Sequence, residues 1–424
     1  MSEPVTFGPF RLEPADSRLE RDGVRVELRR QAISALAVLL RHTGHFVDYD
    51  TMIREGWGGA VVSRHTVAVT IGEVKRALGE IGHWIAYRPR LGYRLEVPRS
   101  EDLIRQANHF WGRMNREGLE KALLYFRQAS EQDSSDARAL EGMAAAYLTL
   151  GTFGMRSAPE MYRGFLEAHA RAVAVGGPTP ELQSELAHAL HVFERRIAEA
   201  RELLTQAHRE RPGAGLVSLR LAMLLATSGQ FDEALVALDQ AEAAEPLHPT
   251  FRPARVFILL CRGEHHAAVR VATEAVDLHP LMPLGRALYA DALALAGNRE
   301  EALKQYRHAC YLSPDLPWLH AMEGAVLAKL GRNGEALAIL EEMEQLREVE
   351  YVDAYFMTLL LGALELPEAA YQELNRALEE NSATLFLLDV DPRMDTLRAD
   401  PRFTRVRDQV FAQAASPGRC RAAG

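Results

Sequence analysis

Cysteine is scarce in this chain of 424 residues, which carries only Cys261, Cys310 and Cys420. Their number is odd, they lie far apart and no two form a Cys-x-x-Cys pair, so neither a disulfide framework nor a zinc site is expected. We interpret Cys261 and Cys310 as thiols packed on helices, and Cys420 as a residue near the end of the chain.

Long apolar runs are also missing. Stretches such as Leu359–Leu361 are far shorter than the roughly 18 apolar residues that a membrane-spanning helix needs. The first residues, MSEPVTFGPF, lack the basic start and apolar run of a secretory signal. The sequence therefore predicts a cytoplasmic protein without a membrane segment.

The motifs of common enzymes are absent as well. The chain has no GxxxxGK(S/T), no GxGxxG after a strand, no GxSxG and no HExxH. We therefore expect no enzymatic activity, no catalytic residue, no cofactor and no metal. His188, His191 and Glu194 recur at three-residue intervals on a predicted helix, but the third lies nearly two turns from the first, so we interpret them as polar residues of a solvated or partner-facing helix.

Charge is divided unevenly along the chain. The net charge of the whole chain is −9, which taken alone argues against a nucleic-acid partner. Residues 1–98, however, hold 14 Lys and Arg against 12 Asp and Glu, a net charge of +2, and the remainder carries −11. The length requires at least two folding units, and a basic first unit keeps DNA binding open.

The first 98 residues mix strand-like alternation with helical periodicity. The predicted order is strands, three helices and a hairpin, which is the order of a winged helix. The elements are a strand at 24–28, a helix containing Ile33 to Leu40, a helix from Asp50 to Trp57 with Asp50 as its N-cap, a helix from Ser63 to Leu78 with Ser63 as its N-cap, and a hairpin over Ile85–Val97.

The third helix has the composition of a DNA-contacting helix. Its apolar stripe, Val67, Ile71, Val74 and Leu78, is expected to pack inward. On the other face, Thr and Val methyl groups suit thymine methyls, a Glu suits a cytosine amino group, and basic residues near the helix end suit phosphates. The predicted contacts on this helix are Arg64 and His65, as alternative phosphate contacts, and Thr66, Val69, Thr70, Glu73, Lys75 and Arg76.

The hairpin supplies a second basic feature. Arg88, Arg90 and Arg94 cluster around a tip that Pro89 restricts, and arginine is the side chain best suited to a narrow minor groove. A solvated basic hairpin without a DNA role is the alternative. We favour DNA contact because the hairpin accompanies the third helix.

Several segments carry a family resemblance, among them FGPFRLEPADSRLERDGVRVELRRQA, VAVTIGEVKRALG and PRLGYRL. Over roughly residues 5–97 the chain resembles OmpR/PhoB-type winged helices, and more narrowly the CadC/ToxR/HilA branch, in which a Glu (here Glu73) stands where response regulators have Arg. The resemblance implies that the helix after Ser63 enters the major groove and that the wing at Arg88–Gly92 reaches the minor groove. It also implies that the loop Gly58, Gly59, Ala60, Val61 and Val62 contacts RNA polymerase and that the protein binds DNA as a homodimer.

From residue 103 on, the sequence repeats with a period of 34. Small or apolar residues recur at Leu166, Ala200, Ala234, Ala268, Ala302, Ala336 and Ala370, prolines at Pro178, Pro212, Pro246, Pro280 and Pro314, and turn glycines at Gly229, Gly263, Gly297 and Gly331. This register resembles the tetratricopeptide repeat. It predicts about eight helix pairs over 103–384, a C-terminal cap and tail over 385–424, and an extended, curved solenoid.

The expected fold is thus mainly α: an N-terminal α+β winged helix over 1–98, then an all-α tetratricopeptide-like solenoid. The register predicts possible ligand contacts on its concave face at Arg220, Met223, Arg252, Phe257 and Arg286. We interpret the chain as a one-component transcriptional regulator that binds double-stranded promoter DNA and whose repeats receive a protein or small-molecule effector. The alternative is an interaction scaffold whose winged helix serves as a docking module.

Overall fold

The computed structural model describes residues 4–21 and 23–412, so Cys420 lies outside the described residues. The chain forms two compact units. The first runs to Ala107 and includes Leu124–Ala139, and the second comprises Asn108–Leu123 and the described residues from Leu140 on. This division differs from the expected boundary at 98–103, because part of a later helix belongs to the first unit. Gln132 Oε1 of that helix accepts a 3.1 Å hydrogen bond from the Gly8 N–H of the same unit.

The first unit opens with a four-stranded antiparallel sheet whose strands follow chain order. Its inner face buries Phe10, Leu12 and Leu19. The sequence pattern located only the last of these strands. The strands are β1 (Val5–Phe7), β2 (Phe10–Glu13), β3 (Arg18–Arg21) and β4 (Val24–Val26).

Three helices and a hairpin follow, which confirms the predicted winged helix. They are α1 (Arg30–Arg41), α2 (Tyr49–Gly56), α3 (Arg64–Leu78), the 3₁₀ helix η1 (Gly79–Trp84), β5 (Ile85–Arg88) and β6 (Gly92–Leu95). The predicted N-cap of α2 was wrong: Asp48, not Asp50, occupies that position, since its side chain accepts a 2.7 Å hydrogen bond from the Thr51 N–H. An Asp in this position satisfies an amide that the first helical turn leaves free.

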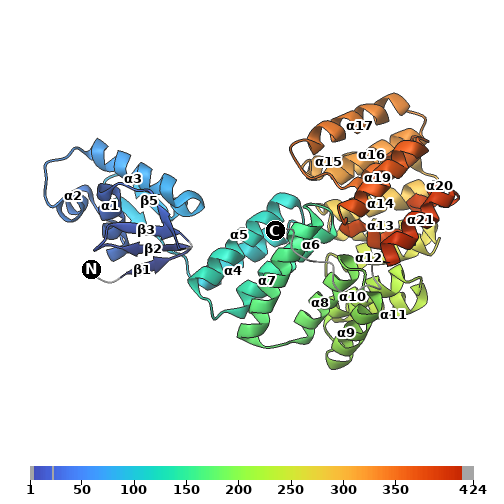
Figure 1. The fold of residues 1–424 in the computed structure, drawn as a ribbon, viewed down its shortest axis with the longest axis horizontal. Helices are drawn as coiled ribbons and strands as arrows, with labels where there is room; N and C mark the ends of the chain where they lie inside the picture. Colours follow the sequence, from blue (N-terminus) through green and yellow to red (C-terminus); the bar gives the residue numbers. More distant parts are fainter. Residues whose placement is uncertain (1–3, 22, 413–424) are drawn as a thin grey trace. The chain divides into compact units, whose positions relative to one another are not determined.

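Sixteen helices occupy the span from Ser100 to Glu379, all of which the structure describes (Figure 1). None of the described helices is both long and apolar enough to cross a membrane. The bounds are α4 (Ser100–Trp111), α5 (Arg116–Gln132), α6 (Ala137–Thr152), α7 (Ala158–Gly176), α8 (Pro180–Val192), α9 (Ile197–Glu210), α10 (Gly215–Thr227), α11 (Phe231–Ala244), α12 (Phe251–Cys261), α13 (His265–Leu278), α14 (Pro283–Leu295), α15 (Arg299–Leu312), α16 (Pro317–Lys329), α17 (Asn333–Arg347), α18 (Ala354–Ala363) and α19 (Pro367–Glu379).

The 34-residue register describes the packing of the later helices. Six of its alanines are fully buried, namely Ala200, Ala234, Ala268, Ala302, Ala336 and Ala370. The turn glycines from Gly229 to Gly331 all have positive φ, between 76° and 92°, a conformation that closes a helix cheaply only for glycine. At the matching position of the α8–α9 turn stands Arg195, with φ of 56°.

The register fails at α7. Leu166, the first residue of the predicted series, is exposed, whereas Phe165 and Ala172 are buried. The ring of Tyr162 lies 5.1 Å from that of Phe193 and 6.4 Å from that of Phe165. Because buried rings remove more apolar area from water than the aliphatic residues of the register would, these aromatics decide which face of α7 packs inward.

The second unit is not the open, extended solenoid that we expected. Arg116, buried at the start of α5, donates from Nη1 to Glu350 at 2.5 Å and from Nη2 to the Asp315 carbonyl at 2.6 Å. Arg195 donates to the Ser382 carbonyl at 3.4 Å and to the side chain of Asn381. Early and late repeats therefore contact one another directly, and the array closes.

A C-terminal cap completes the second unit. It consists of η2 (Ala383–Leu387), η3 (Pro392–Met394), α20 (Asp395–Arg398) and α21 (Pro401–Ala412). Arg393 of the cap pairs with Asp391 at 2.8 Å and with Asp291 of α14 at 3.1 Å. The hydroxyls of Tyr306 and Tyr355 donate to the two carboxylates, so the cap is bound to the repeats by a buried, largely satisfied polar network.

We predict that buried imidazoles make the stability of the second unit depend on pH. Burial lowers the pKa of His191 to about 4, and its Nε2 lies 2.9 Å from Thr227 Oγ1. The folded state therefore keeps this side chain neutral while the unfolded state protonates it near its ordinary pKa of about 6.5. This part of the stability is complete above pH 6.5 and is lost as the pH falls toward 4, by about 1.4 kcal/mol for each pH unit.

Urea denaturation of the full chain at several pH values between 7.5 and 4.5 measures this slope. His191→Gln should flatten it without abolishing it, because burial also lowers the pKa of the neighbouring His188. His65→Gln, at an exposed position, is the control and should leave the slope unchanged. Equal slopes in the wild type and His191→Gln would contradict the prediction.

Candidate functional site

Helix α3 is held at both ends and along one side. Ser63 Oγ accepts a 3.1 Å hydrogen bond from the Thr66 N–H, as predicted for an N-cap. The stripe from Val67 to Leu78 is buried, again as predicted. At the C-terminal end, a Cβ atom on Gly82 would lie 2.4 Å from the Lys75 carbonyl oxygen, so only glycine permits η1 to approach α3 this closely.

The outward face of α3 presents most of the predicted contacts. Arg64, His65, Thr66, Val69 and Arg76 are exposed, and Lys75 is half-buried. The guanidinium of Arg64 lies over the ring of Tyr49, 5.2 Å from its centroid, and Arg76 Nε donates to the Gly72 carbonyl of its own helix at 3.3 Å. These contacts orient two basic side chains without neutralising them.

Glu73 has a partner that the sequence did not indicate. Arg29, which precedes α1, donates from Nε to both carboxylate oxygens at 2.9 Å and also from Nη2. Hydrogen bonding to Arg29 holds the pKa of Glu73 below its ordinary value. The two residues are 44 positions apart, so no local pattern could have paired them. A base that engaged Glu73 would meet an acidic group already bound to a guanidinium.

The structure contradicts the prediction for Thr70. Its side chain is buried, and its hydroxyl donates to the Thr66 carbonyl at 2.9 Å. A threonine on a helix forms this bond to its own preceding turn readily. Thr70 therefore faces the interior beside Ile71, and is not available for contact with a base.

The wing exposes two of its three predicted arginines. Arg88 and Arg90 are exposed, and Arg90 has φ of 69° at the tip. A Cβ atom on Gly92 would lie 2.0 Å from the Val47 carbonyl oxygen, which fixes the hairpin against the body of the unit. Arg94 is half-buried instead: it pairs with Glu96 at 2.5 Å and lies over Phe46, which argues against the predicted DNA contact by this residue.

The loop between α2 and α3 is shaped by two glycines. Gly58 and Gly59 have φ of 62° and 78°, so they turn the chain where other residues would be strained. Ala60 is exposed, Val61 is fully exposed and Val62 is half-buried. A fully exposed valine on a short, constrained loop is available to another protein.

The second unit contains a chamber of about 410 Å³. Of the five predicted concave-face residues, Arg220, Met223 and Phe257 line it. The lining positions of α10, α12 and α14 recur with the 34-residue period, so the register could have predicted more of them. Residues from the cap, such as Phe386 and Arg393, also line the chamber, and no sequence pattern indicated them.

Arg252 and Arg286 do not line this chamber, which corrects the prediction for both. Arg252 donates to the Pro246 carbonyl at 2.9 Å, and Arg286 to the Pro280 carbonyl at 2.9 Å. Each bond joins an arginine to the carbonyl of the residue six positions earlier, and the second arginine lies 34 residues after the first. The two arginines therefore satisfy the carbonyls of the prolines that close each repeat, which is a structural role.

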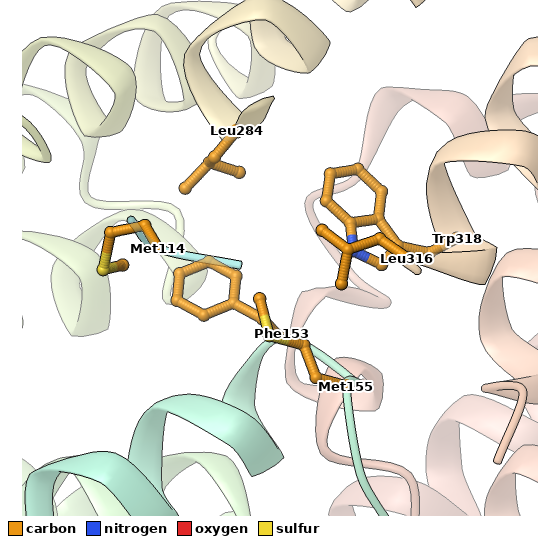
Figure 2. Close-up of a pocket in the computed structure, with 6 residues that line it drawn as sticks. All are labelled: Met114, Phe153, Met155, Leu284, Leu316 and Trp318. Carbon is orange, nitrogen blue, oxygen red and sulfur yellow. The ribbon is translucent and has the colours of Figure 1, made fainter. Parts of the chain in front are cut away.

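A smaller hollow adjoins the chamber. Figure 2 shows the apolar side chains around it, with Phe153 and Met155 from one segment and Leu316 and Trp318 from another. Its volume of about 10 Å³ leaves room for at most one water molecule, and apolar walls of this kind stay dry. Four of the six side chains, Met114, Phe153, Leu284 and Trp318, also line the larger chamber.

One group of three potential metal ligands lies within the described residues. Ligand atoms of Cys310, His320 and Glu323 all lie within 4.8 Å of one another. Each already has another role: burial raises the pKa of the Cys310 thiol, His320 contacts the Pro314 carbonyl at 3.3 Å, and Glu323 pairs with Arg307 at 3.0 Å. The group is better explained by packing than by a metal.

Three family models match this chain. The family described as "Transcriptional regulatory protein, C terminal" matches residues 23–95, and two models described as "Tetratricopeptide repeat" match residues 194–254 and 259–317. The chain joins a regulator domain of the OmpR/PhoB type to tetratricopeptide repeats. The matched part of the regulator domain contains α3, the wing and the α2–α3 loop.

A curated relative supports this assignment. The transcriptional activator CadC of Escherichia coli strain K12 is 28% identical over 103 residues, which are 23% of this chain and 20% of CadC. The solved DNA-binding domain of E. coli CadC is 27% identical over 23% of this chain and 96% of that domain, with a TM-score of 0.21. Because the match spans a fifth of CadC, it concerns the regulator domain alone.

The repeats resemble solved helical proteins. The human IFIT1 dimer with PPP-AAAA is 15% identical to this chain, with 81% of this chain and 79% of that chain covered and a TM-score of 0.52. At this identity the likeness shows the fold alone.

We predict that Thr70→Val leaves the DNA preference of the full chain unchanged. The hydroxyl is buried and bonded within α3, so its loss should change the free energy of unfolding by about 1 kcal/mol at most. Binding to a panel of DNA duplexes with single base changes measures the preference. The neighbouring, exposed Val69→Ala is the matched variant and should alter it. A preference changed by Thr70→Val but not by Val69→Ala would contradict the buried position of Thr70.

Proposed function

We propose that the chain is a one-component transcriptional regulator whose regulator domain binds double-stranded promoter DNA, as a homodimer, and whose repeats receive a partner or ligand. The observation that carries this proposal is the face of α3: a capped helix, rigidly packed on one side, that presents polar and basic side chains outward. In this proposal α3 enters the major groove, and the wing tip with Arg88 and Arg90 reaches the minor groove. We propose no enzymatic activity for the chain.

The arrangement of charges supports contact with phosphates. Although residues 1–98 carry a net charge of only +2, several carboxylates are already paired locally, as Glu73 is with Arg29 and Glu96 with Arg94. Within the described part of the chain, Arg64, Arg76, Arg88 and Arg90 form no ion pair, and all four are exposed. Phosphate neutralisation by such residues makes binding strongly dependent on salt.

Glu73 is the residue through which α3 would recognise a particular DNA base. A carboxylate on the major-groove face is suited to accept from a cytosine amino group. Arg29 is largely exposed even while it is paired with Glu73. Approach of DNA would therefore bring a base edge to the carboxylate and a phosphate within reach of the guanidinium.

The α2–α3 loop is the proposed contact for RNA polymerase. It lies next to the DNA-contacting helix in the chain and exposes Val61 fully. The alternative function, an interaction scaffold that does not bind DNA, is favoured only by the small net charge of the first unit.

We predict distinct effects for Glu73 and Arg76 in the full chain. Arg76→Ala should weaken binding to specific and random DNA alike and reduce the slope of log affinity against log salt by about 1. Glu73→Ala should instead reduce discrimination between the two DNAs by about 1–3 kcal/mol. Fluorescence anisotropy with the gene's upstream region and with a scrambled duplex, over a series of salt concentrations, measures both quantities.

Arg209→Ala is the matched control, because Arg209 is an exposed helical arginine of the second unit whose Nε also donates to the carbonyl four residues earlier, Thr205, at 3.3 Å. It should leave affinity and salt slope unchanged. Absence of binding by the wild type at low salt would favour the scaffold. An equal loss on both DNAs after Glu73→Ala would count against base recognition by this residue.

A further inference from the structure

The same face of three equivalent helices, α10, α12 and α14, lines the chamber in the second unit. Leu216 on α10, Thr250 just before α12 and Leu284 on α14 occupy equivalent positions of the repeat, and Trp318 continues the series on α16. Seven residues further on, about two helical turns, Met223, Phe257 and Asp291 form a second series with the same period. Residues of α6, α8 and the cap are also among those that line the chamber. The chamber therefore results from closure of the array and is larger than a packing defect.

Its volume of about 410 Å³ falls within the range of roughly 300–1,000 Å³ that is typical of small-molecule sites. Most of the lining side chains are aliphatic or aromatic. Water inside such a chamber would leave the apolar side chains of its walls hydrated, which is unfavourable. A mostly apolar molecule inside the chamber would displace this water.

The charged side chains of the lining are neutralised by the protein itself. Arg220 donates to Glu185 at 3.2 Å and to Ser184 Oγ at 2.6 Å. Arg393 pairs with Asp291 and Asp391. His188 is neutral, because burial and the nearby Arg220 lower its pKa well below the ordinary value. Each arginine of the lining is already paired, so no cation is left to balance an anionic group. Arg393 is shared by two carboxylates, and burial raises the pKa of Asp291, which favours its uncharged form. Burying an unbalanced charge is costly.

Some buried polar atoms of the lining residues, by contrast, have no hydrogen-bond partner. Among the described residues, Thr152 Oγ1, Glu185 Oε2 and His188 Nδ1 are buried polar atoms without a hydrogen-bond partner, and all three residues line the chamber. Buried polar atoms are rarely left unpaired, and several around one cavity call for an explanation. A molecule with a hydroxyl or carbonyl group would supply partners after small side-chain rotations.

We propose that this chamber binds a small, mostly apolar molecule that carries no net charge and one or a few hydrogen-bonding groups. The inference rests on the proposed role of the repeats as the part that receives a signal, and it specifies the chemical class of that signal. Apolar contacts would supply the affinity, and the unpaired polar atoms would orient the molecule.

The test compares two dyes that share an aromatic skeleton. N-phenyl-1-naphthylamine is neutral, and 8-anilino-1-naphthalenesulfonate carries an added sulfonate. Titrated into the full chain, the neutral dye should bind saturably with one site per chain, and the anionic dye at least about tenfold more weakly, which corresponds to about 1.4 kcal/mol. Absence of saturable binding by the neutral dye, or equal affinity for both dyes, overturns the proposal.

Variants locate the site. Leu219→Trp places a larger side chain in the lining and should weaken binding of the neutral dye by about tenfold or more. Leu203→Trp is the matched control: both leucines are partly buried against the same apolar cluster, but only Leu219 lines the chamber. Adding Phe257→Ala to Leu219→Trp should restore binding by returning volume. An equal loss with Leu219→Trp and Leu203→Trp, or no recovery in the double variant, overturns the assignment to this chamber.

Dye binding and DNA binding are measured separately on the same full chain. Loss of the DNA shift with intact dye binding would refute the proposed regulator function alone. Intact DNA binding without saturable dye binding would refute this inference alone.

Discussion

Close contact between helices at small side chains is the constraint on which the repeat unit depends. The alanines of the 34-residue register, such as Ala234, Ala268 and Ala302, have no exposed surface, so a larger side chain there would separate the helices or leave strain. Because the same contact recurs from Ala200 to Ala370, the rotation from one helix pair to the next recurs as well. The accumulated rotation brings Arg116 to Asp315 and Arg195 to Ser382, and without it neither the closed array nor the chamber would exist.

The sequence could predict the features that depend on residues close together in the chain or one repeat apart, and not those that depend on distant residues. The helix pairs, their turns and the buried stripe of α3 depend on residues a few positions or one repeat apart, and they were predicted. Closure depends on pairs such as Arg195 and Ser382, 187 positions apart, for which no periodic pattern exists. Leu166 was predicted wrongly because Tyr162 and Phe165 outweigh the register locally, and Thr70 because its hydroxyl bonds to its own helix.

The candidate DNA-binding surface shows the same division. Side-chain type and helical spacing placed Arg64, Val69 and Arg76 outward, since these depend on α3 alone. Whether an arginine is free depends on which neighbours the fold brings to it, and here prediction failed for Arg94, which pairs with Glu96 two residues on and lies over the ring of Phe46. A solvent-exposed ion pair contributes little to stability, but it removes a charge from the surface that a phosphate would meet. The net charge of the first unit therefore says little about which arginines can contact phosphates. Whether each arginine already has an ion-pair partner is more informative.

Closure also gives the repeat unit a physical means of responding to a small molecule. The lining of the chamber comes from both the middle repeats, through residues such as Phe257, and the C-terminal cap, through Phe386. An occupant that contacts both would bind the closed array and not an opened one, and its free energy of binding would add to the polar network around Arg393 in favour of closure. A molecule shifts such an equilibrium only by its difference in affinity for the two states. Because opening the cap would remove part of the lining, that difference would be larger for an occupant of this chamber than for a ligand held on the face of a single repeat.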